Sequence, residues 1–175
     1  VAIATGSDGQ VLTSTGAGSP PAFETAAGGG GKILQVQSGT ATSGLQTTTS
    51  TSWQKKTSPV CTITPSSTSS KIFLSGGTLF KTGGTYVYGD FRREISGGAS
   101  TDNISGATYG IVWRQESTNT LPNSNENAHM EFLDSPSTTS EIEYSINFRA
   151  DNASYTVMVG QGLFQYIFAL EIDGT

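Results

Sequence analysis

Residues 141–149 alternate without interruption between polar and apolar side chains, and this alternation constrains the fold more than any other feature. In an extended strand, side chains at every second position share one face. The apolar face holds four residues: Ile142, Tyr144, Ile146 and Phe148. A slip of one residue would expose all four, so the register is strongly specified. The pattern predicts an antiparallel sheet with one buried face and one solvated face.

From residue 32 onward, short runs rich in Thr and aromatic residues alternate with clusters of Ser, Gly, Asn and Pro. No window shows a helical period, and Ser, Thr and Gly account for 70 of the 175 residues. Such runs are typical of strands separated by turns. We expect strands at 32–37, 47–54, 60–64, 71–79, 86–95, 108–116, 129–133, 141–150, 155–159 and 164–172. This number of short strands predicts an all-β fold, an antiparallel β-sandwich of the jelly-roll type.

The last expected strand is apolar on both faces. Ile167 and Ala169 share one face, and the other face is almost entirely aromatic or aliphatic. Because one face of a sandwich strand normally meets solvent, this composition predicts a second partner. We hypothesise that the aromatic face lines the axis of a homotrimer, through Phe164, Tyr166, Phe168 and Leu170. The alternative is a central core strand covered by a loop of the same chain.

The first 31 residues differ from the rest. A short alternating run at 10–15 is followed by a turn at 16–19, a second short run at 20–24, and four glycines at 28–31. Two short strands cannot bury enough apolar surface to fold alone in water. We therefore expect residues 1–31 to form a stem with a Gly-rich linker, preceding a head domain at 32–175. The stem is expected to be held by contacts between chains that involve Val11, Leu12 and Phe23.

Two parts of the sequence resemble virus fibre proteins. The stretch GSDGQVLTSTGAGSPPAF at 6–23 resembles repeated elements of phage tail fibres, which form thin trimeric shafts before a globular tip. The region from 32 onward is similar to the tips of marine phage fibre proteins, in the pieces KILQV, ITPSSTSSKI, LDSPSTTS and ALEI. This resemblance implies a trimeric jelly-roll head akin to those of tumour necrosis factor and C1q. It also implies a place on the virion surface, after assembly in the host cytoplasm.

Charge and cysteine content exclude several classes of function. The formal net charge is −5 with nine Lys and Arg residues, whereas nucleic-acid binding requires clustered basic residues. The two basic pairs, Lys55-Lys56 and Arg92-Arg93, are expected to be solvated. The single cysteine, Cys61, lies in an apolar run and is expected to be a buried small hydrophobic residue. No apolar run approaches the length of a membrane-spanning helix.

No catalytic or metal motif stands out. His129 and Glu131 are two positions apart, so they are expected to share a face, but a surface histidine is the simpler interpretation. Glu141 and Glu143 have a spacing compatible with a glycosidase pair, and neighbouring polar residues indicate an exposed face instead. Asp134, Asp151 and Asp173 lie near loops without the dense acidic spacing of a calcium site. We expect no enzymatic activity, no cofactor and no metal.

Aromatic residues near polar loops give the best binding signal. Aromatic rings cover the apolar face of a sugar, while amides and carboxylates bind its hydroxyl groups. The loops at 97–106 and 117–127 are long, polar and rich in Asn. Trp113 alternates with Tyr109 and Ile111 and is expected in the core. The candidate receptor contacts are Tyr86, Tyr88, Asn103, Tyr109, Asn119, Asn123 and Asn125.

These observations favour a virion structural protein without enzymatic activity. It would be a trimeric fibre tip that attaches to a glycan or a protein on the host surface, with a glycan favoured. It would meet other virion proteins on its N-terminal side. One alternative is a fibre or decoration protein of the capsid with a purely structural role. Another is a polysaccharide depolymerase, which would require an acidic cleft or a longer repetitive β-helix.

Overall fold

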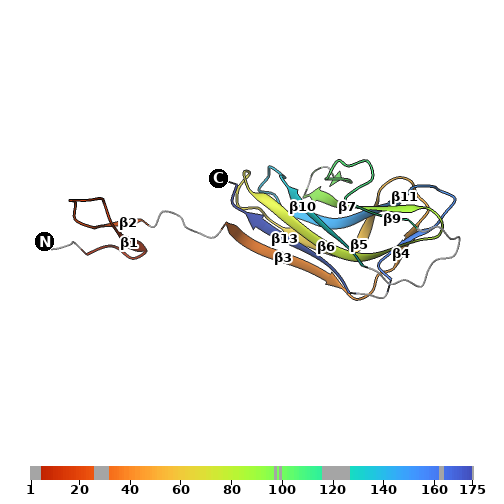
Figure 1. Cartoon of the computed structure of the whole chain (residues 1–175), viewed down its shortest axis with the longest axis horizontal. Coiled ribbons are helices and arrows are strands. Elements are labelled where there is room, and N and C mark those ends of the chain that lie inside the picture. Colours follow the sequence, from red (N-terminus) through yellow and green to blue (C-terminus); the bar gives the residue numbers. More distant parts are fainter. Residues whose placement is uncertain are drawn as a thin grey trace. The chain divides into compact units, whose positions relative to one another are not determined.

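The computed structural model describes residues 5–25, 32–96, 98, 100–115, 127–161 and 164–174. The chain divides into two compact units, Val1–Lys32 and Ile33–Thr175. The described residues form strands and turns but no helix, so none of them forms a helix that could span a membrane. The prediction of an all-β antiparallel fold is confirmed (Figure 1).

The first unit contains a two-stranded antiparallel sheet. β1 (Gln10–Thr13) pairs with β2 (Ala22–Thr25), so that Leu12 lies opposite Phe23. The turns between them use glycine at positive φ, at Gly16 and Gly18, where other residues would be strained. Val11, Leu12 and Phe23 are all exposed, because two strands of four residues offer no second layer to cover them.

The second unit is a sandwich of two antiparallel sheets. The first sheet contains β3 (Ile33–Ala41), β4 (Gln46–Thr48), β6 (Lys71–Thr82), β10 (Asn127–Asp134), β12 (Val157–Val159) and β13 (Gln165–Ile172). The second sheet contains β5 (Gln54–Ile63), β7 (Tyr86–Ile95), β8 (Ser100–Thr101), β9 (Val112–Gln115) and β11 (Ile142–Ala150).

The eight main strands pair in nested order. β3 pairs with β13, β5 with β11, β6 with β10, and β7 with β9, so the first strand meets the last and the innermost two meet each other. This nesting gives the sheet orders β3-β13-β6-β10 and β5-β11-β7-β9. It is the topology of a jelly roll, in which a long folded hairpin wraps around one core.

The core lies between the two sheets. The four apolar residues of β11 are fully buried, as their alternation predicts, and they pack against Ile72 and Leu74 of β6 and Ile167 and Ala169 of β13. Each such side chain contributes roughly 1.5–3 kcal/mol on full burial. Cys61 is buried in the same core, which confirms its prediction as a small hydrophobic residue.

Strands β3 and β7 begin at opposite ends of the sandwich. β3 begins at Ile33 opposite Ile172, the last residue of β13, and on its other side Ile172 pairs with Lys71 at the start of β6. β6 is 12 residues long, which places its two ends roughly 35 Å apart at the usual rise per residue. Tyr86 follows the far end of β6 by a short turn. The start of β7 therefore lies at the end of the sandwich opposite Ile33.

One prediction about the outer face of β11 is wrong. Ser145 and Asn147 were expected in solvent, but both are fully buried. The segment 100–111 folds back over this face, and the Asn147 amide donates a hydrogen bond to the backbone oxygen of Asp102. Asp90 of β7 lies under the same segment and accepts hydrogen bonds from Ser105. The outer face of the second sheet is therefore covered locally by its own loop.

Two expected strands are shorter than predicted. The expected strand at 47–54 is split, because β4 ends at Thr48 and β5 begins only at Gln54. The expected strand at 108–116 is reduced to β9, and Tyr109 lies on a turn closed by a hydrogen bond from the Gly110 nitrogen to the Ala107 oxygen. Gly110 has φ of 75°, and a Cβ there would lie 2.3 Å from the Gly89 oxygen. Only glycine therefore lets this turn lie against β7.

Candidate functional site

An aromatic groove opens at the end of the sandwich opposite Ile33. It has a volume of about 840 Å³, which is within the range of small-molecule sites. Strands β7 and β9, the turn at 107–111 and the residue after β11 form its walls. Its lining residues are Tyr86, Tyr88, Ala107, Thr108, Tyr109, Gly110, Ile111, Trp113 and Asp151.

The four rings of the aromatic groove contact one another. Tyr86 and Tyr88 project from the same face of β7 and stack in parallel, with centroids 6.1 Å apart. Trp113 meets Tyr86 edge to face at 5.6 Å, and Tyr109 tilts against Tyr88 at 5.3 Å. Trp113 and Tyr109 remain 60% and 58% exposed, whereas Tyr88 is buried. Tyr88 thus supports the wall, and Trp113 and Tyr109 present free aromatic surface.

Arg149 lies beside Tyr88, its cross-strand partner, and helps to fix the wall of the groove. Its guanidinium carbon lies 4.5 Å from the centroid of the Tyr88 ring and 5.2 Å from that of Trp53, so the cation is held near two aromatic faces. The same guanidinium donates a 2.9 Å hydrogen bond to the Thr108 oxygen. These contacts connect β11 to the turn that carries Tyr109. They also engage the positive charge of Arg149 with groups of the protein itself.

Asp151 supplies the polar side of the groove. The Tyr88 hydroxyl donates a 3.0 Å hydrogen bond to Asp151 Oδ1, while the carboxylate itself is exposed. Burial, followed by this hydrogen bond, raises the pKa of Tyr88 to about 12. The phenol therefore stays protonated at neutral pH and remains a hydrogen-bond donor to Asp151.

Some of the predicted receptor contacts line the groove and others do not. Tyr86, Tyr88 and Tyr109 all line the groove. Asn103 does not, because its side chain stabilises its own turn by donating to the Ala107 oxygen and accepting from the Gly106 nitrogen. Asn119, Asn123 and Asn125 lie outside the described residues. Asp151 and Thr108 were not predicted, since nothing in their local sequence marks them.

Trp113 was expected in the core, and this expectation is wrong. β9 is an edge strand that pairs with β7, and Trp113 lies opposite Tyr88 on the outer face of the second sheet. The segment at 100–111 covers part of that face but leaves Trp113 exposed. Its alternation with Ile111 suggested a longer strand, and that signal could not distinguish the inner face from the outer one.

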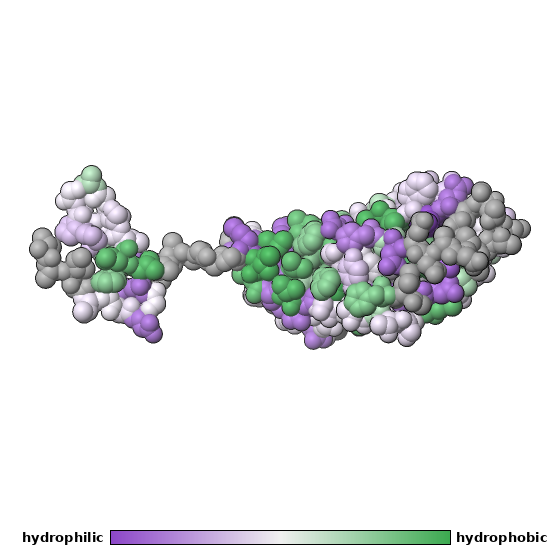
Figure 2. Space-filling view, turned by 60° about the horizontal axis from the view of Figure 1, so that its bottom comes forward, coloured by the Kyte–Doolittle hydropathy of each residue, from purple (hydrophilic) through white to green (hydrophobic). Residues whose placement is uncertain are grey.

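A second surface is the apolar sheet face, the outer face of the first sheet. Cross-strand partners place its side chains in rows: Val36, Leu170, Phe73 and Leu133 form one row, and Ser38, Phe168, Ser75 and Glu131 form the next. Phe164 and Phe168 are 55% and 36% exposed, and Val36 and Leu133 are exposed as well. Figure 2 shows hydrophobic residues gathered on the sandwich near the end at which β3 begins.

The four predicted interface residues of the last strand belong to this apolar sheet face. Phe164, Tyr166 and Phe168 contact one another in sequence, with centroids 6.1 and 5.5 Å apart. Ile167 and Ala169, which point to the opposite face of β13, are fully buried in the core. No loop among the described residues covers Phe168. The face is thus open in the single chain, as are Val11, Leu12 and Phe23 of the hairpin.

His129 lies at the edge of the apolar sheet face. Its Nδ1 is 2.9 Å from the Tyr166 hydroxyl, and its Nε2 is 3.1 Å from Glu131 Oε1. The expected proximity of His129 and Glu131 is therefore correct. Tyr166 reaches across β6 at Gly77, where a Cβ would lie 2.6 Å from the tyrosine ring. Both His129 and Glu131 are exposed, as expected of surface residues.

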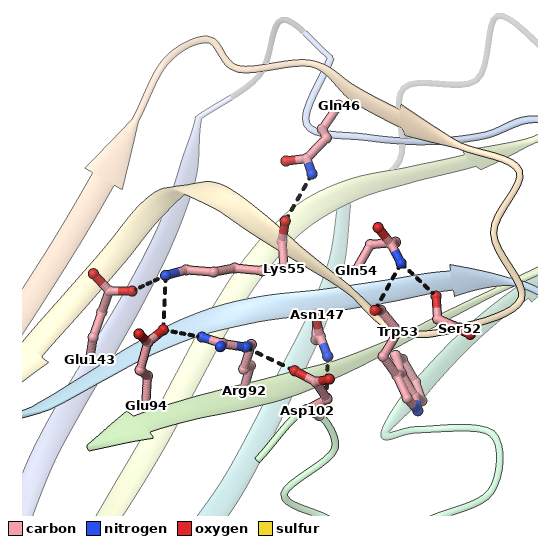
Figure 3. A network of polar contacts seen from close by, with 10 residues as sticks. All are labelled: Gln46, Ser52, Trp53, Gln54, Lys55, Arg92, Glu94, Asp102, Glu143 and Asn147. Carbon is pink, nitrogen blue, oxygen red and sulfur yellow. Dashed lines mark hydrogen bonds and ion pairs between the residues drawn. The ribbon is translucent and has the colours of Figure 1, made fainter. Parts of the chain in front are cut away.

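One carboxylate of the Glu141–Glu143 pair lies in an ion-pair network. Glu143 Oε1 lies 2.5 Å from Lys55 Nζ, and the same ammonium is 3.3 Å from Glu94. Figure 3 shows the network continuing from Glu94 to Arg92 and on to Asp102. Charges held in such a network stabilise one another, and no carboxylic acid here lies in an apolar pocket that would favour its protonated form.

The basic pairs are less solvated than predicted. Lys56 is fully buried, while Lys55 beside it joins the ion-pair network. Arg92 and Arg93 point to opposite faces of β7, and Arg93 reaches Asp134 through hydrogen bonds of 2.7 and 2.8 Å. Neighbouring residues of a strand point to opposite faces, so the two members of each pair meet different surroundings. Asp134 is thereby used in an ion pair, and no group of acidic, His or Cys residues among the described residues is arranged to hold a metal ion.

Comparisons with known proteins give no family. No family model matches the chain, and no curated protein matches it. Among solved structures, the chain is similar to a chain of the T13 IBDV viral particle, at 9% identity and a TM-score of 0.38, over 93% of this chain and 44% of the other. It is also similar to the VP2 subviral particle of infectious bursal disease virus, at 9% identity and a TM-score of 0.36, over 93% and 42%. The chain spans less than half the length of the solved chains that it matches.

Proposed function

We propose that the chain is a non-enzymatic structural protein of a virion, in which the sandwich is the tip of a fibre that attaches to a glycan on the host surface. The position of the aromatic groove carries this proposal. The N-terminal part of the chain leads into the sandwich at Ile33, and the groove lies at the opposite end. A binding site at the distal end of a tethered head is the arrangement that attachment requires.

The apolar sheet face supports assembly into a homotrimer. Exposed contiguous apolar surface of this kind is typical of a subunit interface. Three copies would bury the faces around Phe168 and Leu170 against one another, and the exposed Val11, Leu12 and Phe23 of the hairpin would pack in the same assembly. Three grooves on one particle tip would then multiply weak contacts through avidity.

The resemblance of residues 6–23 to phage fibre elements supports a place in a fibre rather than elsewhere. On this proposal, the N-terminal side meets other virion proteins and the sandwich points outward. A capsid fibre or decoration protein with a purely structural role is the second candidate, because the apolar sheet face would serve it equally well. The aromatic groove favours attachment, since a purely structural role leaves its exposed rings without a partner.

Electron microscopy of the parent particle tests the proposal. Gold-labelled antibody raised against residues 33–175 should decorate the outer ends of fibres. Free trimer added before the virus should also reduce attachment of the particles to their host. Label on the capsid shell without an effect on attachment would favour the structural alternative. An unlabelled particle would contradict both candidates.

A further inference from the structure

The aromatic groove contains features that narrow the chemistry of its ligand. Of its described lining residues, only Asp151 carries a charge. A neighbouring cation, Arg149, lies over the rings of Trp53 and Tyr88 and donates to the Thr108 oxygen. A ligand in the groove would therefore meet a carboxylate without a free basic partner among the described lining residues. Acidic ligands would be repelled, because like charges at close range are unfavourable.

The free aromatic surface suits a flat apolar ring face. Tyr88 is engaged on several sides by Arg149, Tyr86 and Tyr109, so it is not available to a ligand. Trp113 contacts Tyr86 edge to face and is more than half exposed. Together with Tyr109, which contacts Tyr88, it offers two exposed rings in the groove. The C–H face of a pyranose stacks on such rings, and the volume leaves room for more than one sugar unit.

Asp151 is placed to accept hydrogen bonds from sugar hydroxyls. Its Oδ1 already accepts the hydroxyl of Tyr88, and a carboxylate has roughly four acceptor sites, so several remain for a ligand. The bond from Tyr88 also fixes the orientation of the carboxylate before a ligand arrives. Pre-organisation of this kind reduces the entropic cost of binding. Thr108 lines the groove as well.

We propose that the aromatic groove binds neutral oligosaccharides, with pyranose rings stacked on Trp113 and Tyr109 and with Asp151 accepting hydrogen bonds from their hydroxyl groups. This inference rests on the proposed attachment function and names the substrate class of its site. Acidic polysaccharides, built from uronic or sialic acids, are excluded by the same carboxylate. A quaternary ammonium group would also be attracted by Asp151 and by the exposed aromatic rings, so choline serves as the competing ligand in the test.

The test uses the full chain on a printed array of oligosaccharides. The neutral probes are hexaoses of glucose, mannose and galactose, and the acidic probes are hexagalacturonate and oligosialic acid. The protein should bind one or more neutral probes, and the affinity for them should change less than about twofold between low and high salt, because no charge pair is formed. Preferential binding of an acidic probe, binding of no probe, or displacement of the neutral probe by choline would each overturn the proposal.

Variants assign the interaction to the groove. With the best neutral probe, Trp113→Ala and Asp151→Ala should each weaken binding at least about tenfold, because a stacked ring or a charged acceptor is lost. Trp113→Phe retains a ring and should remain within about threefold of the wild type. Binding that is unaffected by Trp113→Ala would place the site elsewhere and overturn the proposal. Since the array needs no virus, its failure is distinct from failure of the proposed function, which particle imaging measures.

Discussion

The hydroxyl of Tyr144 donates a 2.6 Å hydrogen bond to Asp134 Oδ2, and this bond joins the two sheets of the sandwich. Tyr144 belongs to β11 of the second sheet, and Asp134 ends β10 of the first. Arg93 completes the contact by donating to both oxygens of the same carboxylate. Because the Tyr144 ring is fully buried, its phenol meets no solvent that could replace the carboxylate. Burial, with the charge of Asp134, also raises the pKa of Tyr144.

Tyr144→Phe should therefore lower the free energy of unfolding by about 1.5–3 kcal/mol, the usual contribution of a hydrogen bond to a charged group. The ring would still fill the core, so the loss would report the hydroxyl alone. Urea unfolding followed by tryptophan fluorescence measures the change. Tyr109→Phe removes an exposed phenol and serves as control, with an expected change below about 0.5 kcal/mol. Equal stability of both variants would show that the bond to Asp134 contributes nothing.

The apolar sheet face predicts a change in oligomeric state on introduction of a charge. Phe168→Glu would place a carboxylate among Leu170, Tyr166 and the copies packed against them, and a buried unpaired charge costs several kcal/mol. Light scattering should give a mass near three times 18.2 kDa for the wild type and near 18.2 kDa for the variant. Leu45→Glu, at an exposed apolar residue on a loop, should remain trimeric. A wild-type chain that stays monomeric and folded at micromolar concentration would contradict the interface.

Much of the fold could be predicted from the sequence because alternation encodes it directly. β11 and β13 each contain a set of apolar residues at every second position, and the inward sets, such as Ile146 and Ile167, lie in the core as expected. The nested pairing of eight strands follows from the jelly roll that was predicted from strand number and spacing. The placement of Phe168 on the open side of β13 follows from the same period of two.

The candidate site was predicted only in part because it depends on the path of one loop. Alternation assigns Ser145 and Trp113 to a face but cannot tell whether a loop covers that face. The segment 100–111 covers Ser145 and leaves Trp113 exposed, against both expectations. Its path is fixed by long-range contacts, such as the hydrogen bond from Ile111 to the Gly89 oxygen, which no local pattern announces. Asp151 enters the groove through another long-range contact, the hydrogen bond from its nitrogen to the Tyr86 oxygen.

The hydrogen bonds to Glu171 predict that the protein loses stability in acid. This fully buried carboxylate of β13 accepts hydrogen bonds from the Ser66 nitrogen, from the hydroxyls of Ser66 and Ser70, and from the amide of Gln35. Burial alone would raise the pKa of Glu171, but the hydrogen bonds from Ser70, Gln35 and Ser66 outweigh burial and lower it to about 2.

Because the folded pKa of Glu171 is below the unfolded value of 4.5, its stabilisation is present above that value and is lost as the pH falls toward 2. The contribution is about 2–3 kcal/mol. The free energy of unfolding of the wild type should fall over this interval, and that of Glu171→Gln should fall less, while being lower at pH 7. Urea unfolding at pH 7 and pH 3 compares the two. An identical pH dependence in both proteins would rule out Glu171 as the cause.

The burial of Lys56 predicts the opposite effect, a gain in the stability of the protein in base. Its side chain is fully buried, and its ammonium donates a 2.6 Å hydrogen bond to the Gly44 oxygen without a carboxylate among its hydrogen bonds or ion pairs within the described part of the chain. Burial lowers the pKa of Lys56 to about 8 from 10.5. The unfolded chain therefore binds more protons than the folded chain between these values, and stability rises with pH across that window.

Lys56→Met should accordingly be more stable than the wild type at pH 7, by about 1–3 kcal/mol after the loss of the bond to Gly44 is subtracted. The difference should shrink above pH 8 and become small by pH 10.5, where the lysine is neutral in the folded chain and about half protonated in the unfolded chain. Thermal unfolding at pH 7, 9 and 10.5 measures it. Lys71→Met, at a surface side chain that donates to the Ser135 hydroxyl, is the matched control. A Lys56→Met variant that is less stable at pH 7 would mean that the buried ammonium stabilises the fold, because its hydrogen bond would then outweigh its desolvation.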